Sequence, residues 1–259
     1  MKTHLIAIPI IIFFASCTKT IDVNLRTAAS QIVIQGNITN LGGPYYVKIN
    51  KSVSFDADNT YPAVYGAIVS VLDSNTNVRD YFTQTGNEGY YASNKLSGQI
   101  GHTYKLSVII DGEEYTSSST MPDYVGINEL TFTHTKIFNQ VRNLPQVNFK
   151  DPQGVTNYYT FTLLVNNVPY KAFYALDDRL TDGNMIRQQL YMDSAYIQMN
   201  DLVTVVMASV DKNVYNYYNV LQSNSGASST TPSNPPSNIS NNALGYFGAE
   251  CVDVKSVTF

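Results

Sequence analysis

Hydrophobic and polar residues alternate along the chain from Gln31 to Met121. The alternation has the period of two that is expected of a strand with one buried face. It falls into seven short runs, marked by Ile32 to Ile38, Val47 and Ile49, Val69 and Val71, Val78 to Phe82, Tyr90, Tyr104 to Ile110, and Tyr115 to Met121. We therefore predict seven strands in this part of the chain.

Turn-forming residues separate these runs: Gly42-Gly43-Pro44, Asp73-Ser74-Asn75, Gly86 to Gly89, Gly98 to Gly101, and Asp111-Gly112. The Asp-Gly pair between two alternating runs is typical of a β-hairpin. About seven short strands in ~95 residues are typical of an immunoglobulin-like β-sandwich, which we predict for residues 30–122. Tyr104 enters the sixth run after a glycine-rich turn, where such folds often place a corner tyrosine.

The pattern changes after Met121-Pro122 and predicts a second β-rich domain over residues 123–259. Strands are expected at Leu130 and Phe132, at Val147 to Phe149 and Tyr158 to Val165 as a hairpin, at Leu190 to Met192, at Leu202 to Val210, at Leu244 to Phe247, and at Cys251 to Phe259. The predicted fold class is therefore mainly β: an N-terminal immunoglobulin-like sandwich followed by a second β-rich domain that carries one short helix.

That helix is expected near residues 212–223, with Asp211 as its N-cap. Its apolar residues recur at helical spacing, which favours packing on a sheet over an aromatic platform for a ligand: Val214, Tyr217, Tyr218 and Leu221. Residues 223–242 are rich in Ser, Thr, Asn and Pro, which predicts an irregular surface loop.

The N-terminus has the pattern of an export signal over residues 1–16. Lys2 precedes an apolar run from Leu5 to Phe14, which is about half the ~20 residues that a bilayer-spanning helix needs. Phe14-Ala15-Ser16-Cys17 resembles the bacterial lipobox, so Cys17 is the expected lipidation site and residues 17–29 are the tether. The alternative is an ordinary signal peptide with an incidental cysteine. If Cys17 is acylated, Cys251 has no partner for a disulfide and is expected to be a small buried residue.

The composition excludes two broad classes. The 259 residues are 44% hydrophobic and 14% charged, which argues against general disorder. The formal net charge is −4, so the electrostatic footprint of a nucleic-acid-binding protein is absent. Aromatic residues are unevenly distributed, with 20 Tyr, 11 Phe and no Trp.

Several blocks of sequence are spread along the mature chain: Cys17 followed by Ile21-Asp22, the segment from Ile32 to Thr39, Gly66 to Val69, Gly98 to Leu106, Asn234 to Ile239, and Gly245 to Phe247. Together these blocks resemble the Bacteroidota lipoproteins grouped as domain of unknown function 4249. The resemblance implies an outer-membrane lipoprotein that assists a TonB-dependent receptor, because family members are typically encoded beside such receptors. It does not decide between the periplasmic and the cell-surface face, and it carries over no catalytic residue. Asp193-Ser194-Ala195 resembles the O-glycosylation acceptor of this phylum, which makes Ser194 a candidate.

Sequence signatures of common enzymes are missing. The chain has no Gly-x-Ser-x-Gly elbow, no His-Glu-x-x-His and no phosphate-binding loop. His102 and His134, the two histidines beyond the signal segment, lie on expected strands, where a packing or surface role is the usual one. We therefore predict a non-enzymatic protein without a cofactor.

Asp177, Asp178 and Asp182 are the acidic residues considered for metal binding. A calcium loop beginning at Asp178 would place Leu180 at its third position and Gln189 at its twelfth, where oxygen ligands belong. A solvated turn is the favoured interpretation. Asp56 and Asp58 form a looser cluster with the same interpretation.

Three pairs of adjacent tyrosines are the candidate ligand-binding residues: Tyr45 and Tyr46, Tyr90 and Tyr91, Tyr158 and Tyr159. Neighbouring residues on a strand point to opposite faces, so one ring of each pair is expected inside and its partner outside. Exposed tyrosine suits recognition of protein or glycan surfaces, whereas plain β-propensity is the simpler explanation.

Three functions follow from these patterns. The leading hypothesis is a lipid-anchored accessory of a TonB-dependent receptor that acts through protein or ligand binding. The second is an independent surface module that binds glycans or peptides. Hydrolysis is the third, and it would require an Asp, a His and a Ser to converge in the folded chain.

Overall fold

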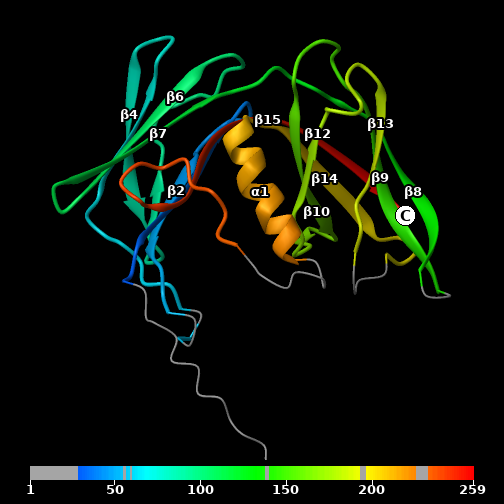
Figure 1. The fold of residues 1–259 in the computed structure, drawn as a ribbon, viewed down its shortest axis with the longest axis horizontal. Coiled ribbons are helices and arrows are strands. Elements are labelled where there is room, and N and C mark those ends of the chain that lie inside the picture. The colour runs from blue at the N-terminus through cyan, green and yellow to red at the C-terminus, as the bar shows by residue number, and fades with distance from the viewer. Residues whose placement is uncertain (1–28, 55–56, 59, 138–139, 193–196, 226–232) are drawn as a thin grey trace, which may run out of the picture.

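The structure is a computed structural model that describes residues 29–54, 57–58, 60–137, 140–192, 197–225 and 233–259 (Figure 1). The strands of the first half are β1 (Ile32–Thr39), β2 (Tyr46–Lys51), β3 (Ile68–Asp73), β4 (Val78–Thr85), β5 (Tyr90–Ala92), β6 (Thr103–Ile110) and β7 (Glu113–Thr120). The second half contains β8 (Ile127–Ile137), β9 (Gln140–Lys150), β10 (Tyr158–Val165), β11 (Val168–Pro169), β12 (Tyr174–Asp177), β13 (Met185–Gln189), β14 (Leu202–Ser209), α1 (Lys212–Ser225) and β15 (Leu244–Thr258). The fold class is mainly β, as predicted.

The seven strands expected before residue 122 are all present and enclose one hydrophobic core. They follow one another in the order β1-β2-β5-β4-β3-β6-β7, all antiparallel. Because side chains alternate between the two faces of a strand, the inner face collects the largest apolar residues. Ile34, Ile38, Val47, Leu106 and Val108 are each at most 1% exposed. This is the immunoglobulin-like sandwich that the alternation predicts.

Two local predictions in this sandwich are also confirmed. Asp111 and Gly112 join β6 to β7 with φ angles of 51° and 86°, the left-handed conformation that a tight Asp-Gly turn requires. Tyr104 is fully buried. Its hydroxyl accepts a hydrogen bond from the Gln99 N–H at 2.7 Å and donates to the Ser97 carbonyl at 3.3 Å. The side chain thus ties the segment before β6 to the strand, as a corner tyrosine does.

β15 belongs to both halves of the molecule. Leu244 to Glu250 pair in parallel with β1, and Cys251 to Thr258 pair antiparallel with β14. Figure 1 shows this strand crossing from one side of the molecule to the other behind α1. At the crossover, the Asn40 side chain accepts from the Val252 N–H at 2.7 Å and donates to the Val252 carbonyl at 3.1 Å. The two strands expected in 244–259 are therefore one continuous strand.

The first core consequently includes residues that the sequence analysis assigned to the second domain. Phe247, Ala249 and Cys251 are fully buried among the side chains of the first sandwich. Burial raises the pKa of the Cys251 thiol to about 11, which fits an inert packing residue. A division of the chain at residue 122 leaves these β15 residues out of the first core. The parallel pairing of β15 with β1 joins segments distant in sequence, so it has no signature in the local sequence.

The second half of the chain forms another sandwich. Strands β13, β9 and β8 make a three-stranded sheet, which faces β10, β14 and the second half of β15 across an apolar core. Phe149 of β9 meets Tyr159 of β10 with ring centroids 4.8 Å apart. The hairpin expected from Val147 to Val165 is therefore wrong, since β9 and β10 lie in different sheets and meet through side chains. Leu190 and Met192 are buried and Tyr191 between them is exposed, but the three residues form no strand.

Helix α1 covers the outer face of β10, β14 and β15. Asp211 caps it, accepting from the backbone N–H groups of Asn213 and Val214 at 2.8 and 3.0 Å. Val214 is fully buried and packs on Ala208, Val210 and Val252. The helix therefore packs on the sheet, as its apolar spacing predicts.

The described part of the loop that follows α1 is more ordered than its composition suggests. The Asn238 side chain pairs with both backbone groups of Phe247, at 2.7 and 2.9 Å. Ser117 of β7 donates to the Asn238 carbonyl, and Ile239 is 7% exposed in the first core. Residues 233–242 thus fasten β7 to β15, which differs from the surface loop expected.

Candidate functional site

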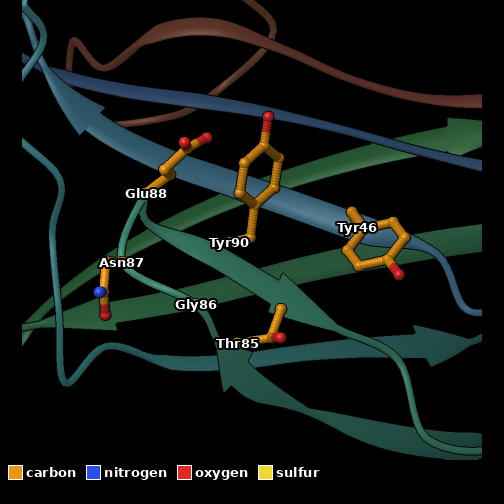
Figure 2. Close-up of a pocket in the computed structure, with 6 residues that line it drawn as sticks. All are labelled: Tyr46, Thr85, Gly86, Asn87, Glu88 and Tyr90. Atoms are coloured by element: carbon orange, nitrogen blue, oxygen red, sulfur yellow. The ribbon is translucent and has the colours of Figure 1, made fainter.

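Two tyrosines lie side by side on the outer face of β2 and β5: Tyr46 is exposed, and Tyr90 is partly buried. Val47 and Tyr91 point into the core, so the residues that alternate with them, Tyr46 and Tyr90, point outward. Their ring centroids are 6.2 Å apart with an edge-to-face angle of 85°. Figure 2 shows both rings projecting from this face, with Glu88 beside Tyr90.

Lys48 adds a positive charge to this face. It pairs directly with Tyr90 across the two strands, and its Nζ lies 4.7 Å from the centre of the Tyr90 ring. A cation at this distance from an aromatic face is attracted by the ring quadrupole. Glu88 supplies a carboxylate nearby, so the surface combines apolar rings with one charge of each sign.

A loop forms one wall of the surface. Residues 60–65 run beside the end of β2, where Val64 donates to the Ile49 carbonyl at 3.0 Å. The Tyr65 hydroxyl donates a hydrogen bond to the Asn87 carbonyl at 2.6 Å, and Tyr61 is 55% exposed. The buried Tyr91 holds this segment from below through its hydrogen bond to the Val64 carbonyl at 3.0 Å.

Gly89 allows the β4–β5 connection to approach β2. Its φ is +77°, and a Cβ there would lie 2.2 Å from the Ile49 carbonyl oxygen. Any other residue would push the connection away from the strand, because backbone atoms cannot give way as a side chain can. The position of Asn87 and Glu88 at the surface therefore depends on this glycine.

These residues line two adjoining hollows that we call the tyrosine groove. One hollow, of about 600 Å³, is lined by Tyr46, Thr85, Gly86, Asn87, Glu88 and Tyr90. The other, of about 770 Å³, shares Asn87 and Glu88 and adds Gln35, Lys48, Asn50, Tyr61 and Tyr65 among others. Volumes of about 300–1,000 Å³ are usual for small-ligand sites. The groove offers aromatic surfaces, amides and two charges, which suits binding.

The other predicted tyrosines lie elsewhere. Tyr45 is 5% exposed, and its hydroxyl donates to the carbonyls of Thr39 and Leu41. Tyr159 is fully buried, and Tyr158 packs against Tyr215 of α1 with ring centroids 4.9 Å apart. Each pair thus has one inward ring, as expected, but Tyr158 is partly covered by the helix. Sequence reasoning did not include Tyr61 and Tyr65, because their loop has no alternation.

The acidic candidates separate into two groups. Asp177 binds Arg179 at 2.8 Å and the Tyr215 hydroxyl at 2.8 Å, and the Arg179 hydrogen bond is the main cause that holds the pKa of Asp177 below its ordinary value. Asp178 and Asp182 instead meet Asp151, which the sequence analysis did not consider. Asp58 is exposed in its loop. Asp56, the lipidation candidate Cys17 and the glycosylation candidate Ser194 lie outside the described residues.

The two histidines make structural contacts. His102 Nδ1 lies 2.9 Å from Asp73 Oδ2, and His134 Nδ1 lies 2.7 Å from Asn143 Oδ1. Within the described ranges, no hydrogen bond joins either imidazole to a Ser or Thr hydroxyl. The Asp, His and Ser convergence that hydrolysis would require is therefore not found among these residues.

Fold and groove define a β-sandwich protein with an open aromatic surface. The family model for a domain of unknown function, DUF4249, matches residues 18–256, so the chain belongs to that family. A search of curated proteins gives no match. One similar solved structure is a segment of two fibronectin type III domains from chicken tenascin, at 8% identity and a TM-score of 0.25, covering 89% of this chain and 99% of that one. No helix in the described ranges is long and apolar enough to span a membrane.

Proposed function

We propose that this chain is a non-enzymatic lipoprotein of the bacterial outer membrane that assists a TonB-dependent receptor through its tyrosine groove. The groove is the observation that carries the proposal: Tyr46, Tyr61 and Tyr65 are each about half exposed, at 46%, 55% and 54%. Strands β2 and β5 hold the floor in place, so a ligand meets rings that are already oriented. The lipobox and the family resemblance supply the location and the partner class.

Removing the groove rings is expected to weaken receptor capture. Tyrosine is a frequent hot-spot residue, and loss of one ring is expected to lower affinity about tenfold, or about 1.4 kcal/mol. The chain and its Tyr46→Ala and Tyr90→Ala variants would be cross-linked in outer membranes, solubilised in detergent and purified by an affinity tag. Recovery of a TonB-dependent receptor would be measured by mass spectrometry.

Tyr191→Ala is the matched control, because Tyr191 is 56% exposed but belongs to the second sandwich. It is expected to recover the receptor as the unaltered chain does. Failure of the unaltered chain to recover a receptor would refute the partner. If the groove variants and the control recover equal amounts of receptor, the groove does not take part in receptor binding.

The anchor is tested separately at Cys17. In the unaltered chain we expect metabolic incorporation of palmitate and recovery in the membrane fraction, since more than one acyl chain gives stable anchoring. Cys17→Ser is expected to lose the label and leave the membrane fraction. Labelling that persists in Cys17→Ser would contradict lipidation at this residue.

The second candidate is an independent module that binds glycans or peptides. The edge-to-face Tyr46 and Tyr90 rings beside Lys48 favour it, since aromatic faces bind sugar rings and peptide side chains. Binding to a glycan or peptide array that Tyr90→Ala abolishes and Tyr191→Ala preserves, without receptor capture, would favour this candidate over the first.

A further inference from the structure

Three carboxyl groups converge in the second sandwich, away from the residues of the tyrosine groove. Asp151 follows β9 directly, and Asp178 and Asp182 belong to the connection between β12 and β13. One oxygen of each carboxyl group lies within 4.8 Å of the others. β9 and β12 belong to different sheets, so the cluster lies where connections from both sheets meet.

Two of these carboxyl groups are buried without a positive partner. Asp151 is 1% exposed and Asp178 is 3% exposed. The neighbouring cations are directed elsewhere: Lys150 donates to the Gly183 carbonyl, and Arg179 binds Asp177. Among the described residues no Lys, Arg or His forms an ion pair with the cluster. Buried negative charges without a counter-charge are strongly unfavourable, which favours a compensating positive charge at the cluster.

Neutral donors hold the three carboxyl groups in place. The Tyr159 hydroxyl and the Gly183 N–H donate to Asp151 at 2.6 and 2.9 Å, the Asn157 N–H donates to Asp178 at 2.8 Å, and the Gly154 N–H donates to Asp182 at 2.7 Å. These bonds orient the carboxylate oxygens but leave their charge uncompensated.

Two residues that contact Asp178 through their backbones each carry a buried side-chain oxygen without a hydrogen-bond partner among the described residues. The two oxygens are Asn157 Oδ1 and Thr181 Oγ1. Asn157 is 7% exposed, and its backbone N–H and C=O both bond to Asp178, at 2.8 and 3.3 Å. The Thr181 N–H donates to the Asp178 carbonyl at 2.7 Å. Buried polar atoms without a partner are rare in native proteins, and an ion or a water is a usual explanation.

We propose that Asp151, Asp178 and Asp182 bind one calcium ion, with Asn157 and Thr181 contributing further oxygen ligands. Calcium takes six to eight oxygen ligands, including carboxylates and amide carbonyls, in flexible geometry. The set contains no His or Cys, the ligands that zinc prefers. The bound ion neutralises the buried carboxylates and joins the β9–β10 connection to the β12–β13 connection. This site is independent of the function proposed for the tyrosine groove.

Calorimetric titration of the full chain tests the site. The protein would be treated with a chelator, dialysed in detergent and titrated with calcium chloride and, separately, magnesium chloride. We expect one calcium site with a Kd of about 10⁻⁴ to 10⁻³ M, the range of extracellular calcium modules, and weaker magnesium binding. The melting temperature is expected to rise with calcium, because the ion binds the folded state.

Asp182→Asn is the informative variant, because Asp182 is exposed and its loss should leave the fold intact. We expect calcium affinity to fall at least tenfold. Asp177→Asn, which alters the neighbouring carboxylate outside the cluster, is expected to bind as the unaltered chain does. No calcium binding by the folded, unaltered chain at about 10⁻³ M would overturn the proposal, as would equal affinity in Asp182→Asn or equal affinity for magnesium.

Discussion

Replacing Gly245 with alanine is expected to lower the free energy of unfolding by about 2–5 kcal/mol. Gly245 has a φ of +101° and pairs with Ile34, and a Cβ would lie 2.0 Å from the Ile34 carbonyl oxygen. The left-handed backbone costs about 1–2 kcal/mol, and forcing atoms into a packed site adds about 1–3 kcal/mol. Because this pairing completes the first core, denaturant unfolding should show the loss as a lower midpoint.

Gly101→Ala separates the two contributions to this loss. Gly101 has a φ of +77°, and no atom lies within 4 Å of the position that its Cβ would take. Alanine at position 101 would therefore have the backbone strain but no steric clash, and we expect the free energy of unfolding to fall by about 1–2 kcal/mol. If both alanine variants lose the same free energy, close approach of β15 to β1 contributes nothing measurable.

Glu250→Gln is expected to stabilise the protein by up to about 3 kcal/mol above pH 7. Glu250 of β15 is 7% exposed, and burial raises the pKa of its carboxyl group from 4.5 to about 7. Asn37 donates to it at 3.3 Å, and the charge of Asp211 opposes its ionisation further. The difference between 4.5 and about 7, at about 1.4 kcal/mol per pKa unit, gives about 3 kcal/mol.

The sign of the pH dependence follows from the raised pKa. The folded state holds the Glu250 proton more tightly than the unfolded state does, so this contribution to stability is complete below about pH 4.5. It is lost as the pH rises to about 7. Denaturant titrations at several pH values should show that fall in the unaltered chain and a smaller one in Glu250→Gln. Glu114→Gln, on the exposed face of β7, controls for removal of a surface charge. An unchanged pH profile in Glu250→Gln would disprove the assignment.

The first sandwich was predictable from sequence because its information is local. Alternation placed β1 to β7, and Asp111-Gly112 fixed one hairpin. The continuity of β15 was not predictable, since its two halves pair with strands that are distant in sequence and run in opposite directions. The expected hairpin between β9 and β10 failed for a related reason. A turn-forming sequence such as Asp151 to Gly154 also suits a connection between facing sheets.

The candidate sites show the same limit. Alternation predicted the outward positions of Tyr46 and Tyr90, because neighbours on a strand face opposite ways. The wall formed by Tyr61 and Tyr65 depends on a loop that pairs with β2 without strand periodicity. Likewise, Asp151 comes from the β9–β10 connection, whereas Asp178 and Asp182 lie beyond β12, so a scan for a contiguous calcium loop cannot find the set.

The course of β15 determines when the two sandwiches can finish folding. β1 and β14 each keep an unpaired edge until residues 244–258 have left the ribosome, and unpaired edges readily associate with other chains. Contacts between segments so distant in sequence also form slowly. Neither sandwich can therefore be completed before residues 244–258 have been synthesised, and until then the edges of β1 and β14 remain open to pairing with other chains.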